Sequence, residues 1–495
     1  MPLYAIALTA LLLISCGGGG GGGSSSPSPS ASAPTAAPAP TPAPTVSVSL
    51  SASQVEVGEE VTITYSSSNS NSCEAKGSFS SIDSLSGTQT FSSWDIGTYI
   101  FELTCSGAGG SATASQELRI IETFPEGINN RGTDFLLNDF SVPRVAINHS
   151  GKIIGIFRKT TSASNNGFAQ IYEWDRDKWL QKGSDISASC SGYCTDIEFS
   201  GDGLTVALSN APGRGKVLIF EWDGLDWVQK GADLVGEGNN DDFGDDVALS
   251  INGDIIVIGA VDACNNGCGS GSVYVYEWDG NFWNQKGLTI DAERDNDRFG
   301  TSVDINDDGN IFVAGASLND NSGGTNAGHA RVFEWADGSW TQKGADIDST
   351  LSSLNLGTRS IISSDGNSVA ISGAGGYGYN GKIYTYTWDG TRWIQQKEIS
   401  GNDVTGESRG ERLGVSLDVD KSFNTIISGA YYASKNVYRG GAAKFFNNDG
   451  TFLGSIDGDV SEGAMGSDVA INKNGSIAII AAVDLVKVVT LNFNN

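Results

Sequence analysis

A pair of tryptophans around a tight turn recurs five times in this chain of 495 residues. The five copies begin at Tyr172, Phe220, Tyr276, Phe333 and Tyr386, and the third copy reads YEWDGNFWNQKG. Ten of the eleven tryptophans belong to these pairs. The pairs lie within a longer unit that repeats at roughly 50 residues, a period typical of solenoids and propellers. This repeat constrains the fold more than any other feature of the sequence.

The repeated unit is clearest over residues 241–290, where it divides into four predicted strands. The segments VALS and DIIVIGA flank Asn252-Gly253, and SVYVYEW and WNQKG flank Asp279-Gly280. Asn-Gly and Asp-Gly between β-forming residues are strong hairpin signals. Each predicted strand carries apolar residues on both faces, which suits a sheet packed between two other sheets. The sequence therefore predicts an all-β chain, and its 66 glycines agree with many turns.

A large apolar residue followed by glycine recurs in the later copies, at Phe243-Gly244, Phe299-Gly300, Leu356-Gly357, Leu413-Gly414 and Met465-Gly466. A Gly-Ala pair follows at Gly259, Gly315, Gly373 and Gly429. This pattern resembles the FG-GAP repeats that form the blades of integrin α-type propellers. The resemblance covers most of residues 138–495. The first two copies depart from it, and the terminal proline of GAP is missing where Val261, Ser317 or Gly375 follows the alanine. The resemblance to FG-GAP repeats implies a seven-bladed β-propeller over residues 122–495.

The last copy is incomplete, because it ends after three predicted strands. Its missing outer strand has a counterpart at the start of the repeat region. The segment INNRGTDF, which covers residues 128–135, aligns with WLQKGSDI at residues 179–186. We expect this N-terminal outer strand to complete the last blade and close the propeller, since an open edge strand favours aggregation.

The tryptophan pairs are predicted to be architecture. Trp278 and Trp283 flank a short loop and should face each other across a hairpin. Such aromatic pairs contribute about 0.5–1.5 kcal/mol beyond the burial of their area. A ring of platforms that stack on sugars is the functional alternative, but one structural role explains all five copies.

The N-terminal segment MPLYAIALTALLLISC has an apolar run that is too short to span a bilayer but suits a signal peptide. Its last residues, from Leu13 to Cys16, resemble the lipobox of bacterial lipoproteins. This resemblance implies a signal peptide over residues 1–15 and lipid attachment to the membrane at Cys16. An ordinary signal peptide that contains a cysteine is the alternative. Gly17 resembles the outer-membrane sorting signal of Gram-negative lipoproteins, which implies an exported protein at the outer membrane or cell surface.

A tether and a small domain precede the repeats. Residues 16–45 are rich in Gly, Ser and Pro and carry no charge, which is typical of a linker. Residues 46–121 contain alternating runs such as VTITYS and YIFELTC, which predict a small antiparallel β-sandwich. The domain resembles bacterial Ig-like domains. That resemblance implies that Cys73 and Cys105 link strands across the core, that Trp94 is a core residue, and that the domain is a stalk.

The six remaining cysteines form three neighbouring pairs, and an even set in an exported chain indicates disulfides. We predict the pairs Cys73 with Cys105, Cys190 with Cys194, and Cys264 with Cys268, although fifteen pairings are formally open. The close pairs lie too far from histidine in the sequence to indicate zinc sites.

The net charge of -28 repels nucleic acid, which excludes it as an expected partner. Polar loops of variable length between the predicted strands should share one face, and binding sites are common on such loops. The predicted ligand face contains Asp241, Asp242, Asp295, Asp297, Tyr431, Tyr432 and Tyr438. The alternative is that these acids only form turns.

Calcium is the one cofactor for which the sequence offers a candidate. The segment DINDDGN places Asp304, Asn306 and Asp308 at the spacing of a calcium loop. However, the alignment of the repeats puts Asp304 on a strand and Asp308 in a hairpin turn. Calcium needs six to eight oxygen ligands, so we expect no metal or other cofactor.

No catalytic residue is expected, because His149 and His329 lie in no recognisable motif. We therefore predict a membrane-anchored surface protein for binding or adhesion, with a glycan, a matrix polymer or a protein as ligand. A glycan-processing enzyme that uses a pair of carboxylates is an alternative, as is a scaffold in an outer-membrane complex. Two acids that converge on a central pocket would favour the enzyme.

Overall fold

The computed structural model describes residues 41–56, 59–79, 82, 84–93, 97–137, 142–159, 166–189, 194–375, 380–401, 410–433 and 436–493. The regular elements in these ranges are β-strands, which confirms the all-β class. No helix in the described part is long and apolar enough to cross a membrane. Cys16, Trp94 and Cys190 lie outside the described residues. The chain divides into two compact units between Glu122 and Thr123.

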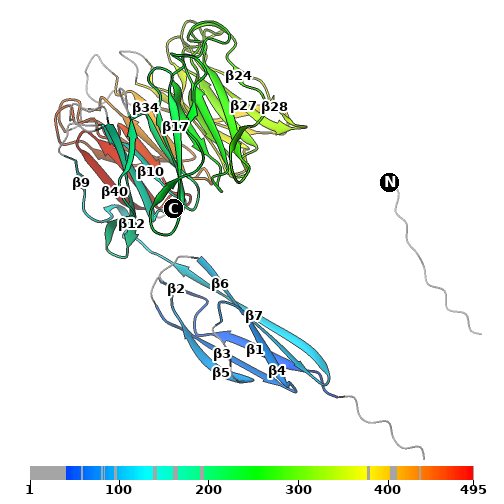
Figure 1. Cartoon of the computed structure of the whole chain (residues 1–495). Helices are drawn as coiled ribbons and strands as arrows, with labels where there is room; N and C mark the ends of the chain where they lie inside the picture. Colours follow the sequence, from blue (N-terminus) through cyan, green and yellow to red (C-terminus); the bar gives the residue numbers. More distant parts are fainter. Residues whose placement is uncertain are drawn as a thin grey trace, which may run out of the picture. The chain divides into compact units, whose positions relative to one another are not determined.

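The first unit contains two sheets, drawn in blue to cyan in Figure 1. One sheet has the order β1 (Thr45–Leu50), β3 (Val61–Ser68), β5 (Ser86–Phe91). The other has the order β2 (Gln54–Glu56), β7 (Gly110–Ile121), β6 (Gly97–Gly107), β4 (Ser72–Gly77). The two sheets share one apolar core, which includes Val48 and Ile63 from the first sheet and Phe101 and Leu118 from the second. The unit is therefore a small sandwich.

The disulfide Cys73–Cys105 is present, but it does not cross the core as predicted. Cys73 and Cys105 lie directly opposite each other on the paired strands β4 and β6 of one sheet. The bond therefore joins neighbouring strands within a sheet. The separation of 32 residues between the two cysteines is compatible both with a bond across the core and with a bond within one sheet, so the sequence could not decide between them.

In the described part of the chain, the second unit contains seven sheets, each built on a path of four antiparallel strands. Sheet 1 is β10 (Arg144–Ile147), β11 (Ile153–Lys159), β12 (Asn166–Asp175) and β13 (Lys178–Gln181). Sheet 2 is β15 (Asp196–Phe199), β16 (Thr205–Asn210), β17 (Lys216–Trp222) and β18 (Trp227–Gln229). Sheet 3 is β20 (Phe243–Leu249), β21 (Ile255–Ala260), β22 (Ser272–Trp278) and β23 (Trp283–Gln285). Sheet 4 is β25 (Phe299–Ile305), β26 (Ile311–Ala316), β27 (His329–Ala336) and β28 (Ser339–Gln342).

The remaining sheets follow the same order. Sheet 5 is β30 (Leu356–Ile362), β31 (Ser368–Gly373), β32 (Lys382–Trp388) and β33 (Trp393–Ser400). Sheet 6 is β34 (Leu413–Val419), β35 (Thr425–Ala430), β36 (Ala442–Asn447) and β37 (Phe452–Asp457). Sheet 7 is β38 (Asp468–Ile471), β39 (Ile477–Ala482), β40 (Leu485–Asn492) and β8 (Gly127–Asn130). A short fifth strand pairs with the third strand in five sheets: β14 (Ile186–Ser189), β19 (Leu234–Val235), β24 (Ile290–Asp291), β29 (Ile347–Asp348) and β9 (Phe135–Leu136).

Sheet 7 combines both ends of the second unit, as predicted. Its outer strand β8 pairs antiparallel with β40 over Gly127–Asn130, so the N-terminal segment completes the last sheet. Pairing of β9 with the other end of β40 extends the contact. The strand that the incomplete last copy lacks is therefore supplied from the start of the repeat region.

The apolar core lies between successive sheets. The second strands β16, β21, β26 and β39 are buried at every position, which explains why both faces of these strands are apolar. One core cluster, for example, joins Val257 and Val273 of sheet 3 to Phe299 and Phe312 of sheet 4. Seven such sheets of antiparallel strands are consistent with a β-propeller.

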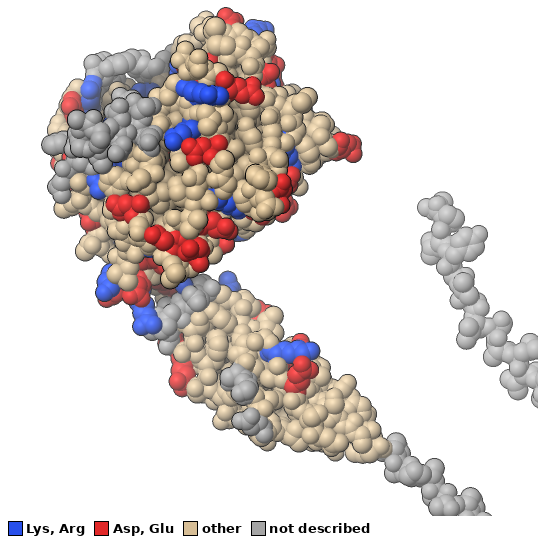
Figure 2. Space-filling model, in the orientation of Figure 1, with Lys and Arg blue, Asp and Glu red and all other residues tan. Residues whose placement is uncertain are grey.

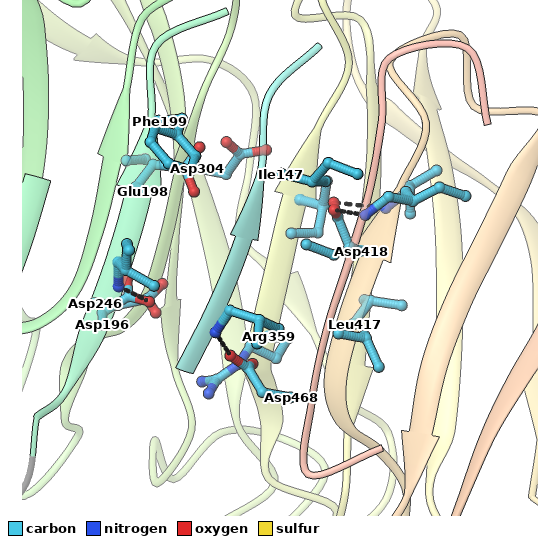
Figure 3. A pocket seen from close by; sticks show the side chains of 18 of the residues that line it. Ile147, Asp196, Glu198, Phe199, Asp246, Asp304, Arg359, Leu417, Asp418 and Asp468 are labelled. Carbon is cyan, nitrogen blue, oxygen red and sulfur yellow. Dashed lines mark hydrogen bonds between the residues drawn. The ribbon is translucent and has the colours of Figure 1, made fainter. Parts of the chain in front are cut away.

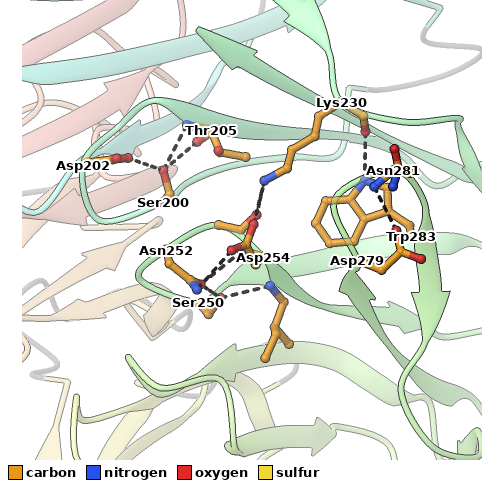
Figure 4. Close-up of polar contacts among 12 residues, drawn as sticks. Ser200, Asp202, Thr205, Lys230, Ser250, Asn252, Asp254, Asp279, Asn281 and Trp283 are labelled. Carbon is orange, nitrogen blue, oxygen red and sulfur yellow. Dashed lines mark hydrogen bonds and ion pairs between the residues drawn. The ribbon is translucent and has the colours of Figure 1, made fainter.

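The tryptophan pairs form contacts between sheets that we call tryptophan clasps. Within each hairpin the two rings pack at centroid distances of 5.0–5.5 Å, as in Trp278 and Trp283. The second indole then donates its N–H to the carbonyl of a Lys or Arg in the preceding sheet. Trp283 Nε1 lies 2.8 Å from the carbonyl oxygen of Lys230, and Figure 4 shows this hydrogen bond. Lys230 Nζ also reaches the Asp254 carboxylate at 2.9 Å.

Five clasps join consecutive sheets, from sheets 7 and 1 to sheets 4 and 5. The donor and acceptor pairs are Trp179 with Arg131, Trp227 with Lys182, Trp283 with Lys230, Trp340 with Lys286, and Trp393 with Lys343, at 2.8–2.9 Å. The cationic side chains also lie over indole rings of the next sheet, at 4.5 Å for Lys182 over Trp222. The clasps confirm that the tryptophan motif is architectural.

A second set of contacts joins the turns between the first and second strands. The His149 amide donates to the Gly201 carbonyl, and equivalent bonds of 2.8–3.5 Å continue through Ile251, Asp307, Ser364, Lys421 and Lys473. The Lys473 amide then donates to the His149 carbonyl. This turn ring therefore returns to its first residue after all seven sheets.

Candidate functional site

The first strands of the sheets line a narrow central cavity, which we call the central channel (Figure 3). Its volume is about 120 Å³, which is enough space for several water molecules. Six carboxylates line it: Asp196, Glu198, Asp246, Asp304, Asp418 and Asp468. The cationic residues Arg359, Lys421 and Lys473 line it as well. The sequence analysis did not single out any of these residues except Asp304.

Five of the channel acids connect neighbouring sheets through the backbone. A carboxylate oxygen of each accepts a hydrogen bond from an amide on the first strand of the next sheet, with sheet 1 following sheet 7. Asp196, for example, accepts from the Val247 amide at 3.0 Å. The other pairs are Asp246 with Val303, Asp304 with Ile362, Asp418 with Ile471, and Asp468 with Val145, at 2.7–2.9 Å. Glu198 is the channel acid without such a bond among the contacts of the described residues.

Burial raises the pKa values of the channel carboxylates, and repulsion between neighbouring carboxylates adds to this effect. Burial raises the pKa of Asp418 to about 7, and burial together with Asp468 raises the pKa of Asp196 to about 6. Burial and the neighbouring Asp196 raise the pKa of Glu198 well above its usual value. Burial lowers the pKa of His149 at the channel end to about 4, with a further contribution from Lys421. The channel therefore holds exchangeable protons near neutral pH.

The cations of the channel offset part of this charge. Lys421 Nζ lies 3.6 Å from Asp304, and Lys473 Nζ lies 3.0 Å from Asp307. Although burial lowers the pKa of Lys421, the carboxylates of Asp304 and Asp418 raise it overall. A group with a pKa near 7 can act as a general acid. However, ligand pockets usually have volumes of roughly 300–1,000 Å³, so this channel suits water and protons better than a sugar ring.

The predicted ligand face is only partly exposed. Asp241 and Asp297 are buried, and their carboxylates accept hydrogen bonds from the Gly238 and Arg294 amides of their own loops. Their carboxylates thus satisfy the backbone of their own tight loops, which does not favour the predicted direct contact with a ligand. Figure 2 shows acidic side chains in several separate groups on one side of the second unit, with lysine and arginine between them.

The other predicted residues occupy more open positions. Asp295 is exposed, whereas Asp242 is half-buried and accepts a hydrogen bond from the Gly213 amide at 2.9 Å. Burial raises the pKa of Asp242. Tyr431 and Tyr432 pack edge to face at 5.0 Å. Asp242 and Asp295 come from loops of sheets 3 and 4, whereas the two tyrosines follow β35 of sheet 6.

Tyr432 and Tyr438 are held together by an arginine. The Arg439 guanidinium lies 5.0 Å from the Tyr432 ring and 4.9 Å from the Tyr438 ring. Arg439 also lies 3.9 Å from Glu462. Tyr438 remains 49% exposed. The arginine thus fixes an exposed aromatic surface beside the loop that carries Glu462.

A pocket of about 450 Å³, which we call the loop pocket, lies beside this tyrosine group. It is formed by loops of sheets 6 and 7, and its walls include Gly440, Glu462, Val460, Leu136 and Leu485. Leu136 and Val460 are 71% and 63% exposed, so apolar side chains remain accessible in its wall. Its volume falls within the range of ligand pockets.

The calcium candidates do not form a common site. Asp304 lies in the channel, whereas the Asn306 side chain accepts hydrogen bonds from the Asn310 and Ile311 amides at 3.0 and 2.9 Å. Asp308 is exposed in the turn. The side-chain oxygens therefore stabilise local structure, as the alignment of the repeats indicated.

The close cysteine pairs differ from each other. Cys194 is disulfide-bonded, and Cys190, its predicted partner, lies outside the described residues. Cys264 and Cys268 are exposed free thiols, so the predicted Cys264–Cys268 disulfide is absent. Their loop instead directs Cys264 Sγ toward the Asp262 carbonyl at 3.5 Å, and the hydrogen bond with Cys264 raises the pKa of Cys268. Counting cysteines predicts pairs but not the conformation of the loop that must bring two sulfurs together.

Two stretches of the chain match the FG-GAP repeat. The family model with this description matches residues 236–276 and 283–333. The first stretch contains β20, β21 and β22 of sheet 3, and the second runs from β23 through β27 of sheet 4. These are sheets in which the sequence analysis found the FG and Gly-Ala elements. No curated protein sequence matches the chain.

Proposed function

We propose that this chain is a lipid-anchored binding protein, in which an Ig-like stalk carries a closed seven-bladed propeller at the bacterial outer surface. The turn ring and the shared sheet 7 support closure, since both connect the last sheet to the first. The apolar run before Cys16 and the uncharged tether support export and anchoring.

We propose the loop pocket as the ligand-binding site. It combines an apolar wall with exposed Leu136 and Val460, and it adjoins Tyr438 and Arg439. Tyrosine and arginine are enriched at the energetic centres of protein interfaces, where an apolar side chain of the partner fills a pocket. The chemistry therefore favours a protein ligand that inserts an apolar side chain. A glycan would favour a polar pocket with aromatic platforms.

The central channel supports catalysis less well. Five of its six carboxylates are engaged with backbone amides between sheets, and its volume is too small for an ordinary substrate. We therefore infer that the channel acids stabilise the propeller and that the protein acts by binding.

The proposal is tested with the full chain in mild detergent, applied to an array of purified matrix proteins, surface proteins and glycans. We expect binding to a protein. The substitution V460D should weaken that binding at least tenfold, because it places a charge in the apolar pocket wall. The control L225D alters a residue that is 86% exposed in sheet 2, outside the pocket, and should bind like the wild type.

Equal binding by V460D and the wild type would exclude the loop pocket as the binding site. Binding to glycans alone would replace the protein ligand with a sugar. Turnover of an arrayed glycan would favour the enzyme instead. Lipid anchoring is tested separately by metabolic labelling with palmitate, where C16S should lose both the label and the membrane fraction.

A further inference from the structure

Three side chains outside both the central channel and the loop pocket lie close together at the junction of sheets 3 and 4. Glu293 follows β24 of sheet 3, and His329 begins β27 of sheet 4; both strands are labelled in Figure 1. Asp346 precedes β29, which pairs with the start of β27. One ligand atom from each of the three residues lies within 4.8 Å of the others. The group thus brings together one imidazole and two carboxylates.

The histidine is buried and has a free ring nitrogen. His329 is 1% exposed, and its Nε2 has no hydrogen-bond partner among the residues that the structure describes. Its Nδ1 faces the Asp348 carboxylate at 3.6 Å. At the equivalent position of sheet 3, the Ser272 hydroxyl faces Asp291 at 2.7 Å. One ring nitrogen thus faces a carboxylate and the other is unpartnered among the described residues, which is the orientation usual for a histidine that binds a metal.

The repeat shows what the site lacks. In sheet 2 the position of His329 is occupied by Lys216, which is an ion-pair partner of Asp233 at 3.4 Å. Asp233 and Asp346 occupy equivalent positions, since each accepts a hydrogen bond from the glutamine four residues earlier, at 2.8 and 2.7 Å. Sheet 4 keeps the carboxylate and replaces the ammonium group with an imidazole. The positive charge that Lys216 supplies in sheet 2 therefore has no fixed counterpart on the His329 side chain.

Arg331 is the cation that faces the same acids, and its position is fixed elsewhere. Its guanidinium lies 4.0 Å from the Phe299 ring and donates to the Asp291 carbonyl at 2.9 Å. Glu293 and Asp346 are the two carboxylates with the strongest electrostatic attraction for Arg331. Asp297 and Asp291 also attract this arginine, so four acidic groups share one cation, which leaves negative charge for a metal ion to neutralise.

We propose that Glu293, His329 and Asp346 bind a zinc ion. One imidazole nitrogen, two carboxylate oxygens and a water complete the four ligands that Zn²⁺ prefers. Calcium fits less well, because it selects oxygen ligands and takes six to eight of them. The ion would bridge sheets 3 and 4, the pair of sheets whose sequences match the FG-GAP repeat.

The test measures Zn²⁺ binding by isothermal titration calorimetry on the full chain in detergent, after removal of metal with a chelator. The protein carries C264S and C268S, so that the exposed thiols of the adjacent loop bind no zinc. We expect one additional site that E293Q weakens at least tenfold. Glu293 is exposed, so this isosteric change should leave folding intact. The matched control is E237Q, at the equivalent exposed position of sheet 2, which should bind like the parent protein.

Co²⁺ provides a second readout, because tetrahedral coordination by histidine and carboxylates gives intense visible absorption. The E293Q and D346N variants should lose this signal, whereas E237Q should keep it. Equal zinc affinity of E293Q and its parent would overturn the proposal. A site that prefers Ca²⁺ over Zn²⁺ would also overturn it, as it would exclude the imidazole as a ligand.

Discussion

The tryptophan clasp makes a quantitative prediction for Gly287. This glycine follows Lys286 and has φ +83°, and a Cβ at this position would lie 2.8 Å from Trp335 Cζ3 and 2.9 Å from Trp340 Cδ1. Neither ring can move freely, because the two indoles pack at 5.2 Å and Trp340 is hydrogen-bonded to the Lys286 carbonyl at 2.8 Å. The substitution G287A should therefore displace the clasp between sheets 3 and 4.

The expected loss of stability has two parts. A left-handed backbone costs an alanine about 1–2 kcal/mol relative to glycine. Insertion of a methyl group into a packed site costs about 1–3 kcal/mol more. We therefore expect G287A to lower the free energy of unfolding by about 2–5 kcal/mol.

Gly280 provides the control for the backbone part. It has φ +98° in the Asp279-Gly280 turn, and an added Cβ would meet no atom within 4 Å. G280A should cost about 1–2 kcal/mol. The assay is urea unfolding followed by tryptophan fluorescence, since ten of the eleven tryptophans belong to the hairpin pairs. If G287A and G280A lose equal stability, the packing of glycine against the indoles contributes nothing and the clasp argument fails.

Three further predictions follow from the structure. Burial raises the pKa of Asp418 to about 7, well above the ordinary aspartate value, so between these two pKa values the folded state holds a proton that the unfolded state releases. Stability should therefore fall as the pH rises from about 5 to about 7 and level off above about pH 8; urea midpoints should show this slope, at most about 1.4 kcal/mol per pH unit for each proton, and D418N should reduce it. Sheet 6 makes no clasp among its described contacts, so hydrogen exchange by mass spectrometry should be faster in β35 than in β26, and equal rates would contradict this reasoning. Replacing both Cys73 and Cys105 with alanine should destabilise the first unit by about 3–4 kcal/mol, because the disulfide joins residues 32 positions apart and restricts the unfolded chain. Pulse proteolysis in urea would detect this loss as earlier cleavage within residues 41–122, and unchanged cleavage would refute it.

The sequence predicted the repeated unit well because its signals are local. Asp279-Gly280 between β-forming segments indicates a hairpin without knowledge of the rest of the fold. The closing strand was also predictable, since residues 128–135 align with a strand of another copy. Both predictions needed only comparisons along the chain.

The contacts between sheets were harder to predict. A Lys-Gly pair such as Lys286-Gly287 follows four of the five tryptophan pairs, but it contacts the pair of the next sheet, roughly 50 residues later. The spacing within one copy gives no sign of that partner. Similarly, Asp196 and Asp418 lie far apart in the sequence and share a channel only when the sheets are arranged around it.

Exposure was the least predictable property of the candidate site. Asp241 and Asp297 have the composition of surface loops, yet each is buried by hydrogen bonding to its own loop. His329 carries no local motif, and its neighbours Glu293 and Asp346 come from positions before and after it in the chain. Only the three-dimensional arrangement of two sheets brings these groups together.

The shared construction of sheet 7 determines how a pulling force would pass through the molecule. β8 is the first strand of the second unit, so tension applied from the N-terminal side acts first on the pairing of β8 with β40. The next residue, Arg131, is held by the clasp with Trp174 and Trp179 of sheet 1. The load is thereby divided between the last and the first sheet, and the seam where the two chain ends meet is also the point at which the domain resists mechanical detachment.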